Sequence, residues 1–161
     1  MPDPAKAALV RQSKIGSELS DEQCGVLSDL VELREYADGE VVSQEGAVDD
    51  NLRAVIAGAL AVAKKSPEGD WIRLNVLTAG DLAGELAFLD SMPRYAALVA
   101  LGPTKLLSLP RARLESLLER QPHLVYHVMR GIARFAHEVM HRSGAQIAEL
   151  SSYVFKTKAK Y

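Results

Sequence analysis

Between residues 33 and 109 the chain is a series of short apolar runs separated by glycine, proline and acidic residues. Runs of this length and spacing are typical of β-strands joined by tight turns. The strands that we expect are Leu33–Ala37, Glu40–Gln44, Leu52–Ala57, Leu60–Lys64, Trp71–Leu77, Ala96–Leu101 and Lys105–Leu109. Many short strands with this punctuation predict a mainly β fold, an antiparallel β-roll of the jelly-roll kind.

The run Trp71–Leu77 alternates between apolar and polar residues. Successive side chains of a strand point to opposite faces. We therefore expect Ile72, Leu74 and Val76 on one face and the polar residues between them on the other.

Both flanks of the β region are predicted to be helical. Residues 4 to 30 form the first helical segment, in which Ser20 and Gln23 have the spacing of a capping box. A short helix is expected after Pro110, and Pro122 suits the first turn of a long one.

The long C-terminal helix carries an apolar stripe with steps of three and four residues. The stripe consists of Leu124, Val128, Ile132, Phe135 and Val139, and we expect it to continue through Ile147 and Leu150. Spacing of this kind is typical of an amphipathic helix and is close to a heptad repeat. Such a stripe must be buried, either on the β-roll or on a second copy of the chain, and the second case predicts a homodimer.

The length of 161 residues is that of one domain. We expect residues 1–161 to form a single unit with an N-terminal helical segment (1–32), a β-roll (33–109), C-terminal helices (110–155) and a frayed tail (156–161). Residues 1–50 carry 4 basic and 12 acidic side chains, and the rest of the chain carries 15 basic and 9 acidic ones. An anionic ligand is expected to prefer the second part.

Cys24 is the single cysteine, so no internal disulfide can form and a reducing compartment is expected. It lies in a predicted helix, which favours a buried structural thiol over a nucleophile. The N-terminal sequence lacks the apolar core of a signal peptide, and no apolar run reaches the ~20 residues of a membrane span. We therefore expect a cytoplasmic protein without a membrane partner.

The segment from Gly80 to Ala100 contains the residue types that a ribose phosphate needs. Gly84 precedes a short segment with helical propensity, and the backbone N–H groups of a helix start attract anions. Arg94 offers a rigid fork of donors that suits a phosphate, and an ionised Glu85 accepts hydrogen bonds from sugar hydroxyls. A plain surface ion pair between Glu85 and Arg94 explains the same spacing equally well.

The same segment resembles the phosphate-binding cassette of cyclic-nucleotide-binding domains. Such domains occur in the bacterial catabolite activator family, in protein kinase A regulatory subunits and in cyclic-nucleotide-gated channels. The family pattern, Gly-Glu-Leu/Ile-Ala/Cys followed by Arg-(Ala/Ser/Thr)-Ala, is present as Gly84-Glu85-Leu86-Ala87 and Arg94-Tyr95-Ala96. The resemblance covers about residues 15–142.

The resemblance implies a role for each matched residue of the cassette. Glu85 would accept a hydrogen bond from the ribose 2′-hydroxyl, and Arg94 would pair with an exocyclic phosphate oxygen. The backbone N–H groups of Leu86, Ala87 and Ala96 would complete the phosphate site, beside the close backbone approach that a glycine allows.

The resemblance says less about the base. Val62 and Leu74 match strand positions that pack against the base in relatives. Tyr95 replaces a small residue, so its ring is expected to fold over the mouth of the site or to block it in part. Val139 and Met140 stand where catabolite activator relatives use a Thr–Ser pair to bind adenine. We expect cAMP over cGMP, because Tyr95 lacks the small hydroxyl often linked to cGMP.

The resemblance therefore implies a regulatory sensor module and not an enzyme. It would bind cAMP or cGMP as its ligand, require no cofactor, and relay binding through its C-terminal helices to an effector protein or across a homodimer. The alternative is a degenerate fold that has lost the ligand and serves protein interaction or dimerisation. Since the chain ends at Tyr161 with no room for a helix-turn-helix domain, we expect no DNA binding by this chain.

A second motif points elsewhere. His137-Glu138-Val139-Met140-His141 has the H-E-x-x-H pattern of zinc proteases. The third ligand position of the extended motif is Ile147, and catalytic zinc needs three protein ligands. We therefore predict neither a metal site nor a catalytic residue here.

Overall fold

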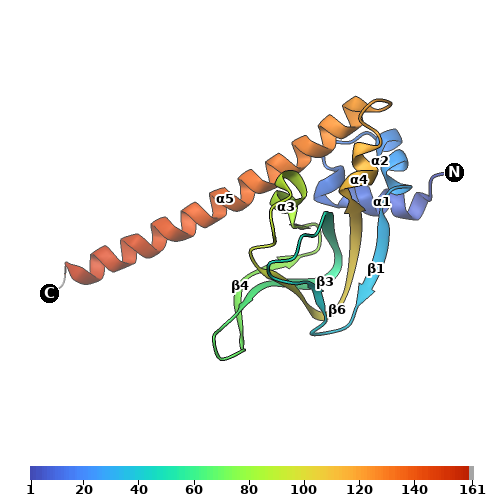
Figure 1. Cartoon of the computed structure of the whole chain (residues 1–161). Coiled ribbons are helices and arrows are strands. Elements are labelled where there is room, and N and C mark those ends of the chain that lie inside the picture. Colours follow the sequence, from blue (N-terminus) through green and yellow to red (C-terminus); the bar gives the residue numbers. More distant parts are fainter. Residues whose placement is uncertain (160–161) are drawn as a thin grey trace.

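Six antiparallel strands form one sheet in the computed structural model, which describes residues 1–159. The order is β1-β6-β3-β4, with β2 also paired to β6 and β5 to β3 (Figure 1). The strands are β1 (Glu32–Tyr36), β2 (Val41–Ser43), β3 (Asn51–Lys65), β4 (Trp71–Thr78), β5 (Leu82–Ala83) and β6 (Ala97–Pro110). This sheet, with helices before it and a long helix after it, confirms the predicted antiparallel β-roll.

Two strands are longer than predicted. Instead of two pairs of short strands, β3 and β6 each run without interruption and pair with one another. The pairing register shifts around Gly58, whose φ is +78°. A side chain at Gly58 would collide with the backbone of Pro103 and Thr104, so the glycine permits a bulge where the two bent strands approach closely.

The helices lie at one end of the roll and across it (Figure 1). They are α1 (Pro4–Gln12), the 3-10 helix η1 (Lys14–Gly16), α2 (Asp21–Ser28), α3 (Glu85–Asp90), α4 (Arg111–Glu115) and α5 (Pro122–Lys158). The predicted capping box starts α2: Gln23 N–H donates to Ser20 Oγ at 3.2 Å, and Ser20 N–H donates to Gln23 Oε1 at 3.0 Å. Cys24 is buried, as predicted, and burial raises the pKa of its thiol.

The first half of α5 packs on the rest of the chain. Leu124, Val128, Ile132 and Phe135 are at most 2% exposed and belong to the main core cluster with residues of α1, α2 and β6. This part of the predicted stripe is thus covered by the chain's own core. At Gly131 the helix comes so close to η1 that an added Cβ would lie 3.0 Å from the Lys14 carbonyl oxygen.

The second half of α5 extends beyond the β-roll (Figure 1). From Met140 to Lys156 every residue is exposed. The predicted frayed tail is wrong at its start, because the helix continues to Lys158. Residues 160–161 of that tail lie outside the described residues. Within residues 1–159, no helix combines the length and apolar composition that crossing a membrane would require.

Candidate functional site

A cavity of about 420 Å³ opens between the segment 82–96, the β3–β4 pair and α5. Eight of the nine predicted site residues line it: Val62, Gly84, Glu85, Leu86, Ala87, Arg94, Tyr95 and Ala96. The ninth, Leu74, does not. Most of the remaining lining is apolar, with a few polar groups gathered near α3, the arrangement typical of a small-molecule site.

Gly84 sets the start of α3 at the wall of this cavity. It is the N-cap of the helix and has a left-handed backbone with φ +78°. No side chain caps this end. The first N–H groups of a helix have no intrahelical acceptor, so those of Leu86 and Ala87 remain available to a ligand.

Arg94 is the central charge of the site. Its side chain is 4% exposed, and its Nη2 donates to the carbonyl oxygens of Asp49 at 2.8 Å and Asn51 at 2.7 Å. Its Nε and Nη1 are buried without a hydrogen-bond partner in the described chain. Unpaired buried donors are costly, and here they belong to a cation that lines a cavity.

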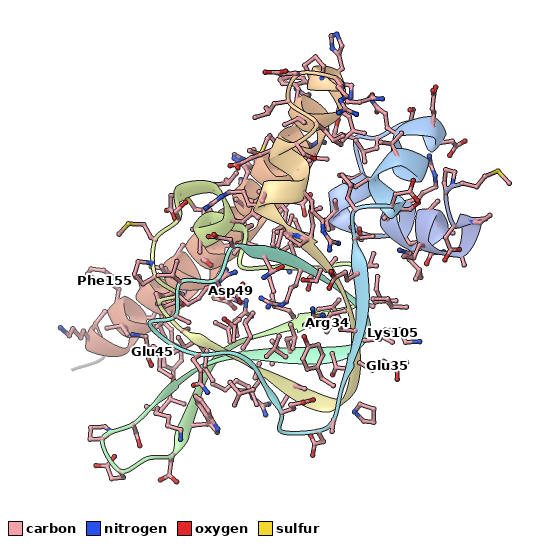
Figure 2. The ribbon with its side chains drawn as sticks, turned by 45° about the vertical axis from the view of Figure 1, so that its right-hand side comes forward. Arg34, Glu35, Glu45, Asp49, Lys105 and Phe155 are labelled. Atoms are coloured by element: carbon pink, nitrogen blue, oxygen red, sulfur yellow. The ribbon has the colours of Figure 1, made fainter. Side chains whose placement is uncertain are left out.

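Asp49 holds Arg94 from the loop between β2 and β3, where Figure 2 also shows Glu45. Its Oδ1 lies 3.7 Å from Arg94 Nη2, while its Oδ2 accepts from Arg53 Nη1 at 2.7 Å. Burial alone would raise the pKa of the Asp49 carboxyl, but hydrogen bonds from Arg53 and Asn51 hold that pKa well below its usual range. Two buried guanidinium groups therefore share the Asp49 carboxylate, which compensates the charge of Arg94 only in part.

Burial also shifts the pKa values of Glu85 and Arg94, the two residues that the sequence first singled out. It raises the pKa of Glu85 and lowers the pKa of Arg94, in each case against an opposing effect of a neighbouring charge. Within the described residues, Arg94 is at ion-pair distance from Asp49 and not from Glu85. The surface ion pair considered from the sequence is therefore wrong.

Tyr95 stands at the mouth of the cavity. Its side chain is exposed, and Lys64 Nζ lies 5.5 Å from the centroid of its ring. Lys64 in turn pairs with Glu45 at 3.1 Å. The ring thus lies along the rim and does not fill the cavity.

The strand floor of the cavity differs from the prediction. Val62 is directly opposite Asn75 in the β3–β4 register, and both side chains line the cavity. Leu74 has no partner in this register because a bulge separates Asn75 from Arg73, and it is 46% exposed and does not line the cavity. The predicted alternation is wrong beyond the bulge, because Ile72 pairs with Lys64 and Val76 with Ala61, which lie on opposite faces of β3. The inner face carries Asn75 and Leu77, a choice that the pattern alone does not make.

On the α5 side, Phe135 and Val139 line the cavity, whereas Met140 is exposed and does not. The side chains that α5 offers to a ligand are therefore apolar. The rings of His137 and His141 are 5.9 Å apart on the same helix. In residues 1–159 no group of three or more potential metal ligands comes together.

Comparison with known proteins gives one consistent result. Residues 33–121 match the family model described as cyclic nucleotide-binding domain. Over 100 residues the chain is 26% identical to the CRP-like cAMP-activated global transcriptional regulator of Mycobacterium tuberculosis. This alignment covers 62% of this chain and 45% of that protein. Over 86 residues it is 36% identical to a cAMP-dependent protein kinase regulatory subunit of Mycosarcoma maydis, covering 53% of this chain and 16% of that one.

The chain thus spans less than half the length of these curated relatives. Among solved structures, a cyclic nucleotide-binding domain from Methylobacillus flagellatus superposes with a TM-score of 0.82 at 22% identity, covering 92% of this chain and 85% of that one. At this identity the superposition establishes a shared fold.

Proposed function

The chain belongs to the cyclic nucleotide-binding domain family, and from this premise we propose that it is a cytoplasmic regulatory sensor that binds cAMP in preference to cGMP. The observation that carries the proposal is the buried guanidinium of Arg94, which lines the cavity with two unpaired donors. An exocyclic phosphate oxygen would satisfy those donors with charge-assisted hydrogen bonds, the strong kind. Catalysis forms no part of the proposal.

Glu85 has the position for the sugar. It lines the cavity next to Gly84, and it is not paired with Arg94. A carboxylate that is free of its neighbouring cation can accept a hydrogen bond from a ribose 2′-hydroxyl. We infer that the sugar binds between Glu85 and the start of α3, with the phosphate toward Arg94.

We propose that the signal leaves the site through α5. Phe135 and Val139 line the cavity from this helix, so a bound base would contact them directly. A ligand shifts a conformational equilibrium only by its different affinity for the two states. We propose that contacts on α5 supply such a difference, and that the helix passes it to an effector protein or to a second copy.

The alternative, a degenerate fold that no longer binds a ligand, is not favoured. The buried donors Nε and Nη1 of Arg94 have no partner in the described residues and destabilise the ligand-free fold. A domain that no longer binds a ligand would gain stability by replacing this residue. The cavity is also open, because Tyr95 lies on its rim.

Thermal unfolding with cAMP, cGMP and cCMP tests the sensor proposal. A ligand at 100 times its dissociation constant adds about 2.7 kcal/mol to the free energy of unfolding, so a clear rise in melting temperature is expected with cAMP. Arg94→Ala should abolish that rise while the ligand-free protein still unfolds cooperatively. No shift with any cyclic nucleotide at millimolar concentration would refute the proposal.

The homodimer is a second part of the proposal, and its interface is not the stripe from Leu124 to Val139 but includes the expected continuation at Ile147 and Leu150. A different stripe with steps of three and four residues follows the outer side of α5, and all its members are exposed except the half-buried Ala136. It consists of Tyr126, Met129, Ala133, Ala136, Met140, Ser143, Ile147, Leu150 and Val154. A sustained heptad spacing on a protruding helix is what a two-stranded coiled coil requires.

Sedimentation velocity of two variants with the same charge change tests this interface. Leu150→Glu places an acid on the stripe, and Ser152→Glu places one on the opposite side of the helix. We expect the wild type and Ser152→Glu to sediment as dimers and Leu150→Glu as a monomer. A monomeric wild type, or a dimeric Leu150→Glu, would exclude this interface.

A further inference from the structure

Asn75 is a polar exception on the sheet side of the cavity. It lies opposite Val62 in the β3–β4 register, so the two side chains share one face of the sheet. Leu77, its neighbour on that face toward the end of β4, is apolar and also lines the cavity. A few placed polar groups in an apolar pocket set the orientation and identity of its ligand.

The orientation of the Asn75 amide follows from its hydrogen bond. Oδ1 accepts from the N–H of Val76 at 2.9 Å. A backbone N–H can only donate, so the amide oxygen must be the atom that faces it. The Nδ2 group, for which the described residues provide no acceptor, is therefore the end of the amide left for a ligand.

The rest of the cavity places the base near this amide. The inference rests on the proposed function, in which Arg94 and Glu85 hold the phosphate and sugar at the α3 end. The remaining lining includes the Val62–Asn75 pair from the sheet and two apolar side chains of α5, while the other polar side chain, Asp90, belongs to α3. With α5 contributing no polar group, Asn75 is the side chain on this floor that can distinguish one purine edge from another.

We propose that Asn75 is a specificity-determining residue that donates from Nδ2 to the position-6 edge of the purine. A 6-oxopurine presents the O6 acceptor there, whereas adenine presents an amino group that also donates. Asn75 thus opposes the cAMP preference expected from Tyr95. A net hydrogen bond to a neutral group corresponds to about a threefold to tenfold change in affinity, so the two classes of nucleotide should bind within about tenfold of one another.

The test compares cyclic AMP with cyclic IMP, which carries O6 without the 2-amino group of guanine. Asn75→Asp keeps an oxygen for the Val76 N–H and replaces the NH₂ donor with an acceptor. Ser66→Asp is the matched control, because it adds the same charge on the exposed β3–β4 loop and retains the acceptor for the Asp70 N–H. Dissociation constants are measured by calorimetry for the wild type and both variants.

For Asn75→Asp we expect the ratio of cyclic IMP to cyclic AMP affinity to fall about tenfold, since one favourable contact is lost and the opposite preference is created. Ser66→Asp should leave the ratio unchanged. A change below twofold in Asn75→Asp, with Arg94→Ala still abolishing both ligands, would overturn the role of Asn75 and leave the proposed function intact. If Arg94→Ala binds both ligands normally, the proposed function itself fails.

Discussion

Replacing Gly84 by alanine is the sharpest test of how the phosphate site is built. Gly84 has φ +78°, and an added Cβ would lie 2.5 Å from Arg94 Cζ and 2.7 Å from its Nη2. These separations are far below van der Waals contact, so the guanidinium must leave its position. A methyl group on the backbone would thus displace the charge that we assign to the phosphate, without changing Arg94 itself.

Two costs follow from this substitution. The left-handed backbone costs an alanine about 1–2 kcal/mol of folding free energy. The displaced guanidinium can no longer present its two unpaired donors to a phosphate, and a hydrogen bond to a charged group contributes about 1.5–3 kcal/mol. Two such bonds correspond to a loss of affinity of at least about a hundredfold.

Gly39→Ala provides a matched control. Gly39 also has φ +78°, but a Cβ there meets nothing within 4 Å. Both variants carry the same backbone cost in thermal unfolding, to which Gly84→Ala adds the loss of the Arg94 hydrogen bonds to Asp49 and Asn51. Calorimetry with cAMP should show weakened binding in Gly84→Ala alone. Affinities within threefold of each other would refute the assignment of Arg94 to the phosphate, since the backbone cost is common to both.

Three further predictions concern neighbouring groups. Glu85→Gln should weaken cAMP binding about tenfold in calorimetry, and it should raise the melting temperature of the ligand-free protein at neutral pH. Burial raises the pKa of Glu85, so the stability contributed by its protonated form is lost as the pH rises, and Gln removes that loss. The pKa of Asp49 is lowered, so its contribution is present above the ordinary carboxyl pKa of about 3.9 and fades in stronger acid. Asp49→Asn should thus be less stable than the wild type at neutral pH and lose less stability on acidification. An equal fall of the free energy of unfolding with decreasing pH in both proteins would contradict this. Tyr95→Thr restores the small hydroxyl of the family pattern and should raise the ratio of cGMP to cAMP affinity, and an unchanged ratio would count against the cAMP preference assigned to Tyr95.

Local chemistry made much of the fold predictable. The capping box at Ser20 and the proline that begins α5 both depend on residues a few positions apart, and both were placed correctly. Gly39, between the predicted strands Leu33–Ala37 and Glu40–Gln44, needs only its own left-handed backbone conformation to form the turn. By contrast, the continuity of β3 and β6 depends on how two distant strands bend around each other at Gly58, and sequence spacing does not contain that information.

The inner face of β4 could not be chosen from the sequence for a related reason. A period of two divides the strand into two faces, but both faces of β4 contain apolar residues. Leu74 lies in the bulge and is exposed, and three other large apolar side chains of β4, Trp71, Ile72 and Val76, are also exposed. Leu74 was expected on the floor of the pocket from the family resemblance, and neither that resemblance nor the strand pattern singled out Asn75.

The two stripes of α5 show the same limit on a helix. Spacing of three and four residues identified the stripe from Leu124 to Val139, but it did not decide whether the β-roll or a second copy covers it. In the structure that stripe is buried in the chain's own core, whereas the outer stripe that includes Leu150 is exposed. A helix with two such stripes can connect a ligand site to a partner, because each stripe contacts a different body.

The role of Arg94 depends on residues more than 40 positions away in the chain, the carbonyl groups of Asp49 and Asn51. Once Asp49 is seen to pair with Arg53, the charge of Arg94 is only partly compensated, and its unpaired donors become a cost that the ligand-free fold must carry. A bound phosphate would remove that cost. Ligand affinity and ligand-free stability are therefore coupled at this residue, and the melting temperature of the protein should respond to a cyclic nucleotide more strongly than to any substitution on the exposed surface.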